Sequence, residues 1–364
     1  MKSKVSLVAL ILLLSVMLAA CSSTDSATSE NSAPASTSSA NPAPTFDLKM
    51  QFHLTGEQFN RTADILIPLI EKNTNGTVKI KPFPAGAVMP VPEMLDAVRT
   101  GTLDMAIYPE GIYAGVVPVC EIGGGLPYAF PNLHEAWIFM WHRGFIDILR
   151  EEYAKQNVYV IPYETFNVGL MTKKPINQIA DLKGMKFRSH SSVAKWLEQG
   201  GASVVNVPSN ELYTALSTGV VDGANWGDAG PMYEMKFQEV AKNYMLPEPG
   251  TGAWNSVMIN MDVWNKFTPE QKQALETTFI MYGKIGQEQT RATTGRALES
   301  MINDFGVAAN TLSAAEQAKA REMAEKSWQL LAEKNPRNTE VINKVKEFLA
   351  ERKEQITPPI TLAW

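Results

Sequence analysis

The sequence predicts an α/β fold with two similar halves, a ligand cleft between them and long helices at the carboxyl end. Strand-like and helix-like segments alternate over 46–108, and the alternation returns over 158–225. Alternation of this kind favours a parallel sheet covered by helices. Apolar stripes at helical spacing fill much of 313–353. With 364 residues, the chain is long enough for two domains of ordinary size.

The amino-terminal segment predicts export and attachment to a bacterial membrane. Lys2 and Lys4 precede an apolar run that ends in Leu18-Ala19-Ala20-Cys21. This order is typical of a secretory signal peptide, here 1–20. The last four residues resemble the lipobox of bacterial lipoproteins, which implies a lipid on Cys21 in the periplasm or at the cell surface. An uncleaved membrane helix is the alternative, but the apolar run is shorter than the ~20 residues that span a bilayer.

The next segment, 21–45, is rich in Ser, Thr, Ala, Pro and Asn and nearly lacks large apolar residues. Such a composition cannot bury a core, so we expect a disordered tether. The whole chain has a formal charge of -5, and loss of the two lysines of 1–20 makes it about -7. This acidic balance argues against nucleic-acid binding. Cys120 is the only cysteine besides Cys21, so it is either a reactive thiol or, as we expect, a buried inert one.

The first half of the body begins with a strand over 46–54 and a helix over 57–73. Apolar residues recur at helical spacing in this helix: Phe59, Ala63, Leu66, Ile67 and Ile70. Further strands are expected over 78–83 and 103–108, with a short helix over 92–100 between them. Three strands joined by two helices predict parallel pairing.

The second half continues the alternation without any repeat by identity. Thr268-Pro269 opens a helix that we expect to run to about residue 285, because Thr caps a helix and Pro suits its first position. Ser209 or Asn210 can cap a helix over 211–218. The other expected elements are strands over 158–162, 168–172, 186–189, 203–207, 220–225 and 257–260, and helices over 192–200, 313–334 and 339–353. The last two helices could pack on the body or form a homodimer with a second copy.

No catalytic motif is present in the sequence. The four histidines form no HExxH zinc pattern, and no GxSxG nucleophile turn occurs. The sequence therefore predicts a binding protein and not an enzyme. In open parallel sheets, ligands bind at the carboxyl ends of the strands, which places the expected site between the two halves.

Several short motifs follow one another in a characteristic order. They are Pro84-Ala85-Gly86, Gly101-Thr102-Leu103-Asp104-Met105, Asp181 to Arg188 and Gly219-Val220-Val221-Asp222-Gly223. Together they resemble the solute-binding proteins of tripartite ATP-independent periplasmic (TRAP) transporters, over about 46–284. Asn225-Trp226, followed by Gly230-Pro231, is similar to the branch that binds 2-oxo or 2-hydroxy acids.

The resemblance implies a two-domain periplasmic-binding-protein-like fold with hinge strands. Domain I would comprise 46–166 plus 254–300, and domain II 167–253 plus 301–364. It also implies capture of a small organic acid and its delivery to the membrane permease subunits of a TRAP transporter. One alternative is a sensor that reports the acid to a membrane receptor, and another is an extracytoplasmic enzyme that uses Glu110 or Glu164 as acid or base.

Arg188 ends the third of these motifs, and the resemblance implies that it pairs with the ligand carboxylate. The chemistry agrees, because a guanidinium offers two parallel donors to one carboxylate. A surface arginine at a strand end is the alternative.

Asn225 and Trp226 follow the strand over 220–224 and are expected to contact the ligand. In the related branch, an acidic residue before the tryptophan, the tryptophan carbonyl and an upstream glutamine hold a cation. This chain has Asn225 and Asn167 instead of the acid and the glutamine. Because an amide does not neutralise a cation, a bridging sodium or calcium ion stays open but is expected to matter little. The two amides suit direct hydrogen bonds to the ligand, and turn chemistry is the alternative.

Glu110 and Glu164 each lie near the end of a predicted strand. Glu110 could be a rim residue or, with Asn225, a metal ligand, whereas Asp228 is expected to point elsewhere. Two acids near one cleft favour a cation or an amine-bearing ligand. His53 could lie near the ligand or be structural. Aromatic candidates for the cleft wall are Tyr108, Trp254 and Trp226, with Tyr113 and Tyr163.

Overall fold

The structure is a computed structural model that describes residues 43–208 and 211–355. The expected signal peptide, the lipid-bearing Cys21, most of the tether and the caps Ser209 and Asn210 lie outside these residues. Within the described part of the chain, no helix is both long and apolar enough to cross a membrane.

The first sheet has five strands in the order β2-β1-β3-β10-β4. Its β1 pairs in parallel with β2 and β3, as the sequence predicts. However, β10 is antiparallel to both β3 and β4, so the sheet is mixed. The parallel pairing expected for the three strands over 46–108 is confirmed, and β10, which the sequence does not place in this sheet, returns from the second half and inserts in the opposite direction. The bounds are β1 Phe46–Phe52, β2 Val78–Phe83, β3 Met105–Pro109, β4 Val158–Val168 and β10 Gly250–Asn260.

The second sheet has six strands in the order β11-β9-β5-β8-β6-β7. Only Gly169 and Leu170 separate β4 of the first sheet from β5 of the second, and 247–249 separate β9 from β10. These two short connections carry the chain between the sheets. In the first sheet, β4 ends at Val168 and β10 begins at Gly250, whereas the expected first domain ends at residue 166 and resumes at residue 254. The bounds are β5 Met171–Thr172, β6 Lys186–Arg188, β7 Ser203–Val205, β8 Gly223–Ala224, β9 Asn243–Leu246 and β11 Ala308–Thr311.

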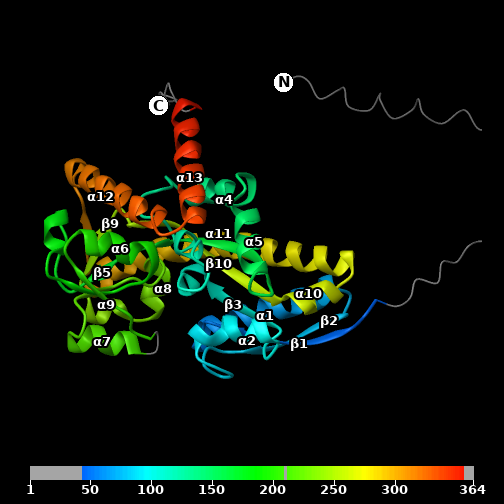
Figure 1. Ribbon diagram of the computed structural model, residues 1–364. Coiled ribbons are helices and arrows are strands. Elements are labelled where there is room, and N and C mark those ends of the chain that lie inside the picture. The colour runs from blue at the N-terminus through cyan, green and yellow to red at the C-terminus, as the bar shows by residue number, and fades with distance from the viewer. Residues whose placement is uncertain (1–42, 209–210, 356–364) are drawn as a thin grey trace, which may run out of the picture. The chain divides into compact units, whose positions relative to one another are not determined.

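Helices cover both sheets (Figure 1), and α11 contacts elements of both halves, including β4 and α8. The α helices are α1 Gly56–Asn73, α2 Met94–Thr100, α3 Cys120–Gly123, α4 Leu133–His142, α5 Phe145–Ala154, α6 Ser191–Gln199, α7 Leu212–Thr218, α8 Ala229–Glu234, α9 Phe237–Val240, α10 Met261–Lys266, α11 Pro269–Phe305, α12 Ala314–Ala332 and α13 Pro336–Gln355.

The long helix α11 begins as predicted and ends later than predicted. Thr268 accepts a hydrogen bond from the Gln271 backbone, and the Gln271 side chain accepts one from the Thr268 backbone. This reciprocal pair fixes the first turn. The helix passes residue 285 and stops only at Gly306, whose φ of 68° is left-handed. A residue without a side chain adopts that conformation at little cost.

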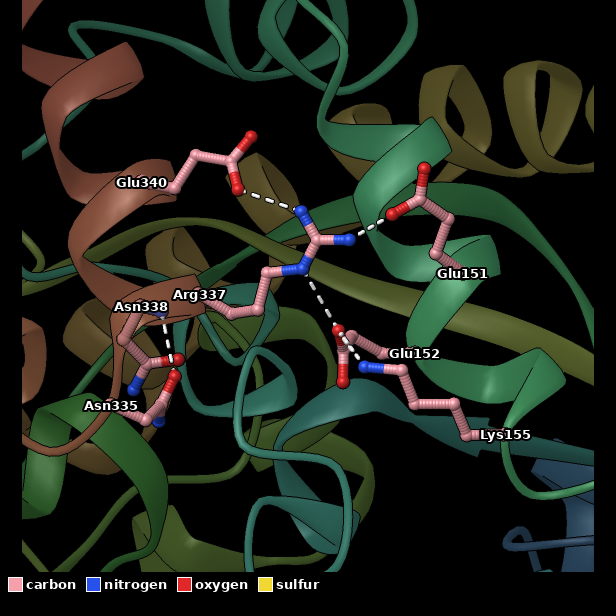
Figure 2. Close-up of polar contacts among 7 residues, drawn as sticks. All are labelled: Glu151, Glu152, Lys155, Asn335, Arg337, Asn338 and Glu340. Carbon is pink, nitrogen blue, oxygen red and sulfur yellow. Dashed lines mark hydrogen bonds and ion pairs between the residues drawn. The ribbon is translucent and has the colours of Figure 1, made fainter.

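The two carboxyl-terminal helices pack on the body, and they pack on different halves. Trp196 of α6 donates a 3.0 Å hydrogen bond to the Ala320 carbonyl of α12, which joins α12 to the second half. At the start of α13, Arg337 contacts three carboxylates (Figure 2), those of Glu151 and Glu152 on α5 and of Glu340 on α13. Because α5 belongs to the first half, the pair of helices joins both halves, whereas the expected boundary placed all of 301–364 with the second.

Candidate functional site

A cleft of about 880 Å³ lies between the two sheets. This volume is in the range of small-molecule sites. The first sheet supplies β4 and β10, and the second supplies β6 and the loop after β8, while α1 and α11 complete the wall. Polar and aromatic residues from both halves line this cleft, among them Glu164, Trp254, Asn255, Arg188, Asn225 and Trp226.

Arg188 is the last residue of β6, and its buried guanidinium lines the cleft. Only 6% of the residue is exposed. Its Nη1 donates to the Asn225 carbonyl at 2.9 Å, and its Nε donates to the Val207 carbonyl at 3.3 Å. Among the described residues, no carboxylate forms an ion pair with it, although a buried charge is costly without one. The guanidinium therefore carries a positive charge that the described residues do not balance.

Asn225 and Trp226 hold this guanidinium in place. Asn225 is buried, and its Nδ2 donates to Ser189 Oγ at 3.0 Å. The Arg188 guanidinium carbon lies 5.3 Å from the centre of the Trp226 ring, a cation–π contact that also limits its movement. Both residues follow β8 at its carboxyl end, where the sequence places the site.

The other basic side chains deep in the cleft are neutral near pH 7. Burial lowers the pKa of His53 to about 4. Burial, with the nearby charge of Arg188, lowers the pKa of His190 to about 3. Burial also lowers the pKa of Arg188 to about 10, so its guanidinium stays protonated. Of the arginines that line the cleft, Arg188 is buried, whereas Arg61 and Arg296 are exposed.

Two carboxylates also face the cleft. Glu164 of β4 accepts a 2.8 Å hydrogen bond from Asn255 Nδ2. Asp228 caps α8, and its Oδ1 accepts from the Gly230 backbone and from Thr294 Oγ1. Burial raises the pKa of both carboxyls, and the charge of Asp228 raises that of Glu164 further. The two acids are therefore close enough to repel each other.

Asp228 lines the cleft, although the sequence predicts that it points elsewhere. The available signal was its position directly after the carboxyl end of β8 and just before a helix, where Asp is a favoured cap. Asn255 was not singled out, since no motif marks it within β10.

Tyr108 and Glu110 do not line the cleft. Both are fully buried in the first half. Glu110 accepts hydrogen bonds from Tyr108 OH at 3.3 Å, Tyr153 OH at 3.0 Å and Cys120 Sγ at 3.1 Å. Glu110 and Asn225 therefore do not form the joint metal site that the sequence suggested. Cys120 is buried, as expected, and burial keeps its pKa well above the usual value.

Asn167 also faces away from the cleft. Its Oδ1 is buried and has no hydrogen-bond partner among the described residues. Successive residues of a strand point to opposite faces, and Phe166 and Val168 already line the cleft. Of the expected wall aromatics, Trp254 and Tyr163 line the cleft as well.

An ion pair crosses the cleft at its rim. Arg61 of α1 pairs with Glu234 at the end of α8, with 3.0 Å between Nη1 and Oε1, and Gln58 Nε2 donates to the same carboxylate at 2.7 Å. These residues belong to opposite halves and line the same cleft. The contact therefore links the two halves directly across the opening.

Two α/β halves joined by short strand connections around a ligand cleft define a solute-binding protein. The model of the family "Bacterial extracellular solute-binding protein, family 7" (DctP) matches residues 57–335, and the chain belongs to this family, that of TRAP-transporter solute-binding proteins. It is 28% identical over 247 residues to the monocarboxylate 2-oxoacid-binding periplasmic protein of Nostoc, and the match spans 66% of this chain and 66% of that relative.

Solved structures share the fold. A TRAP solute-binding protein from Bordetella bronchiseptica, with calcium and picolinate in its site, is similar with a TM-score of 0.80 and 23% identity over 86% of this chain and 94% of that one. One from Pseudoalteromonas atlantica, with sodium and pyruvate, has a TM-score of 0.78 and 18% identity over 86% and 96%.

Within the described residues, no group of three or more His, Cys, Asp or Glu side chains is arranged to hold a metal. The oxygen donors that could share a sodium or calcium ion with a ligand are Glu164, Asp228 and the Asn255 amide. Hard cations prefer such ligands. Asn225 is less suitable, since its Oδ1 lies 3.3 Å from the Arg188 guanidinium.

Proposed function

We propose that this protein captures a small organic acid outside the cytoplasm and delivers it to the membrane permease of a TRAP transporter. A monocarboxylate, with 2-oxo and 2-hydroxy acids tested first, is the ligand class that the similarity to the Nostoc protein favours. Delivery to a permease, rather than signalling to a receptor, follows from membership of the family.

The observation that carries the proposal is the buried, unbalanced charge of Arg188. A ligand carboxylate supplies the missing negative charge and accepts two parallel hydrogen bonds. Each hydrogen bond to a charged group contributes about 1.5–3 kcal/mol. Two of them are comparable to half of the ~8 kcal/mol that a micromolar site requires. Closure of the two halves around the ligand excludes water and strengthens the same contact.

The test is a titration of an acid library, followed by calorimetry on variants. Arg188→Ala should weaken binding of the best acid at least 100-fold, because both charge-assisted hydrogen bonds are lost. Arg188→Lys keeps the positive charge but cannot donate two parallel hydrogen bonds, so its affinity for the acid should lie between those of Arg188→Ala and the parent. Arg99→Ala, which alters an exposed arginine paired with Asp96, is the control and should bind normally.

Circular dichroism must show that the Arg188→Ala variant remains folded. Equal affinity in this variant and the parent would refute the site assignment. Chelation of calcium and replacement of sodium should change the affinity only slightly. A large loss would instead assign a bridging ion to the oxygen donors described above.

Anchoring through lipid on Cys21 is part of the proposal and is supported by the lipobox alone. Radiolabelled palmitate should be incorporated into the parent and not into Cys21→Ser expressed in a bacterial host. If the parent incorporates no label, the lipid anchor is refuted, whereas the proposed ligand binding is unaffected.

A further inference from the structure

The cleft contains a group of hydrogen-bond acceptors in addition to the cationic Arg188. Glu164 and Asp228 face it as carboxylates, and Asn255 adds an amide oxygen, Oδ1, that is buried without a hydrogen-bond partner. All three groups are hydrogen-bond acceptors. A buried acceptor that lacks a donor costs about 1–3 kcal/mol, so a donor is expected to reach it.

The described residues do not supply the balancing cation. Neither Glu164 nor Asp228 forms an ion pair with a described lysine or arginine, and the charged group that acts on Glu164 is the negative Asp228. Arg61 is paired with Glu234 at the rim, Arg296 is an exposed residue of the cleft wall, and both histidines of the cleft are neutral. The acids are thus left with amide, hydroxyl and backbone donors only.

The cationic and acceptor groups come largely from different halves. Arg188 and Asn225 belong to the second sheet and the loop that follows β8, whereas Glu164 and Asn255 are opposite each other on β4 and β10 of the first sheet. A ligand with one positive and one negative group would therefore bond both halves at once. A carboxylate without a positive group would bond only the second half, through Arg188.

We propose that the preferred ligand is an acid that also carries a protonated amine, with its carboxylate on Arg188 and its ammonium group on Glu164, Asp228 and Asn255 Oδ1. This inference rests on the proposed function, and within its monocarboxylate class it favours amino acids over the 2-oxo and 2-hydroxy acids that the similarity to the Nostoc protein suggests. It ranks ligands by their second group: ammonium binds most tightly, hydroxyl less tightly, and an oxo group or plain hydrocarbon least. An oxo oxygen is only an acceptor, and the neighbouring acids repel it.

The experiment compares matched four-carbon acids by calorimetry at pH 7.5 in the full chain. The panel is 2-, 3- and 4-aminobutanoate, the corresponding hydroxybutanoates, 2-oxobutanoate and butanoate, each with and without a calcium chelator in sodium-free buffer. At least one amino acid should bind ten or more times more tightly than its hydroxy counterpart and than butanoate. Chelation and sodium removal should not alter that ratio.

Glu164→Gln is the informative variant, because glutamine still accepts the hydrogen bond from Asn255 and preserves the shape of the side chain. It should reduce the advantage of the amine over butanoate at least tenfold, because the ammonium group loses a charged partner and the butanoate carboxylate loses a nearby negative charge. Asp228→Asn, which retains the capping oxygen of α8, should act in the same direction. Glu71→Gln, at an exposed position of α1, is the control.

The outcomes separate the two proposals. Equal binding of the amino, hydroxy and unsubstituted acids, or an advantage that survives Glu164→Gln, overturns the amine inference alone, provided that binding still depends on Arg188. Tight binding of 2-oxobutanoate that disappears on chelation also overturns it, because a metal ion then occupies the acceptor groups. If no acid of this panel or of the library binds, the proposed function fails as well.

Discussion

Glu110 directly follows the carboxyl end of β3 and is fully buried, whereas Glu164 lies within β4 and is half-buried, and burial raises the pKa of each. Their surroundings differ in the supply of donors. Glu110 receives hydrogen bonds from two tyrosine hydroxyls and one thiol inside the first half. Glu164 receives one, from an amide, and faces the cleft. Burial and a raised pKa therefore do not identify a ligand-binding acid; an incomplete set of donors next to a cavity does.

The largest expected effect tests the internal role of Glu110. Glu110→Ala leaves Tyr108 and Tyr153 hydroxyls without their acceptor and should lower the free energy of unfolding by about 2–4 kcal/mol. Ligand affinity, measured where the variant is fully folded, should stay within about twofold, since Glu110 does not face the cleft. Urea denaturation and calorimetry provide the two measurements.

Glu164→Gln should show the opposite pattern, with little change in stability and a clear change in ligand preference. Glu71→Ala on the exposed face of α1 is the control for both measurements. A Glu110→Ala variant that loses ligand binding while its stability is unchanged would contradict the distinction between the two acids.

A third acid, Glu248, extends the comparison to the connection between the sheets. Burial, with the charge of Asp228, raises its pKa to about 7, from an ordinary value of 4.5. A folded-state pKa above the unfolded value favours the protonated form in the folded protein. Its stabilising contribution is complete below pH 4.5 and is lost as the pH rises through 7.

Relative to Glu248→Gln, the parent should therefore lose roughly 2 kcal/mol of stability between pH 5 and pH 8. Urea denaturation of both proteins at the two pH values measures the difference. Glu71→Gln should show no such pH-dependent difference. A constant gap between parent and Glu248→Gln across this range would mean that the carboxyl does not titrate there.

The smallest expected effect concerns the ion pair that links the halves at the rim. Exposed pairs contribute about 0.2–1 kcal/mol. Glu234→Gln, which breaks the contact with Arg61, should raise the ligand dissociation rate about two- to fivefold in stopped-flow measurements. Asp96→Asn removes an exposed pair within α2 and should leave the rate unchanged. Identical rates in both variants would show that the rim pair does not hold the closed form.

Pro162 illustrates what the sequence could and could not show about the fold. The sequence predicts two separate strands, over 158–162, which Pro162 ends, and over 168–172. The structure has one strand from Val158 to Val168, followed by the short β5. The strand is at the edge of the first sheet, where proline is tolerated, and a register shift between Asn255 and Ser256 lies opposite it.

The sequence alone revealed the helices with clear apolar spacing, the Thr268 cap and the motifs of the family, including the one that ends in Arg188, which lines the cleft. These features depend on residues close together in the chain. Only the tertiary structure decided that β10 inserts antiparallel, that Asn167 and Glu110 face away from the cleft, and that Asp228 and Asn255 face it beside Glu164. Those facts depend on strand register and on packing between segments far apart in the sequence, for which no local pattern provides a signal.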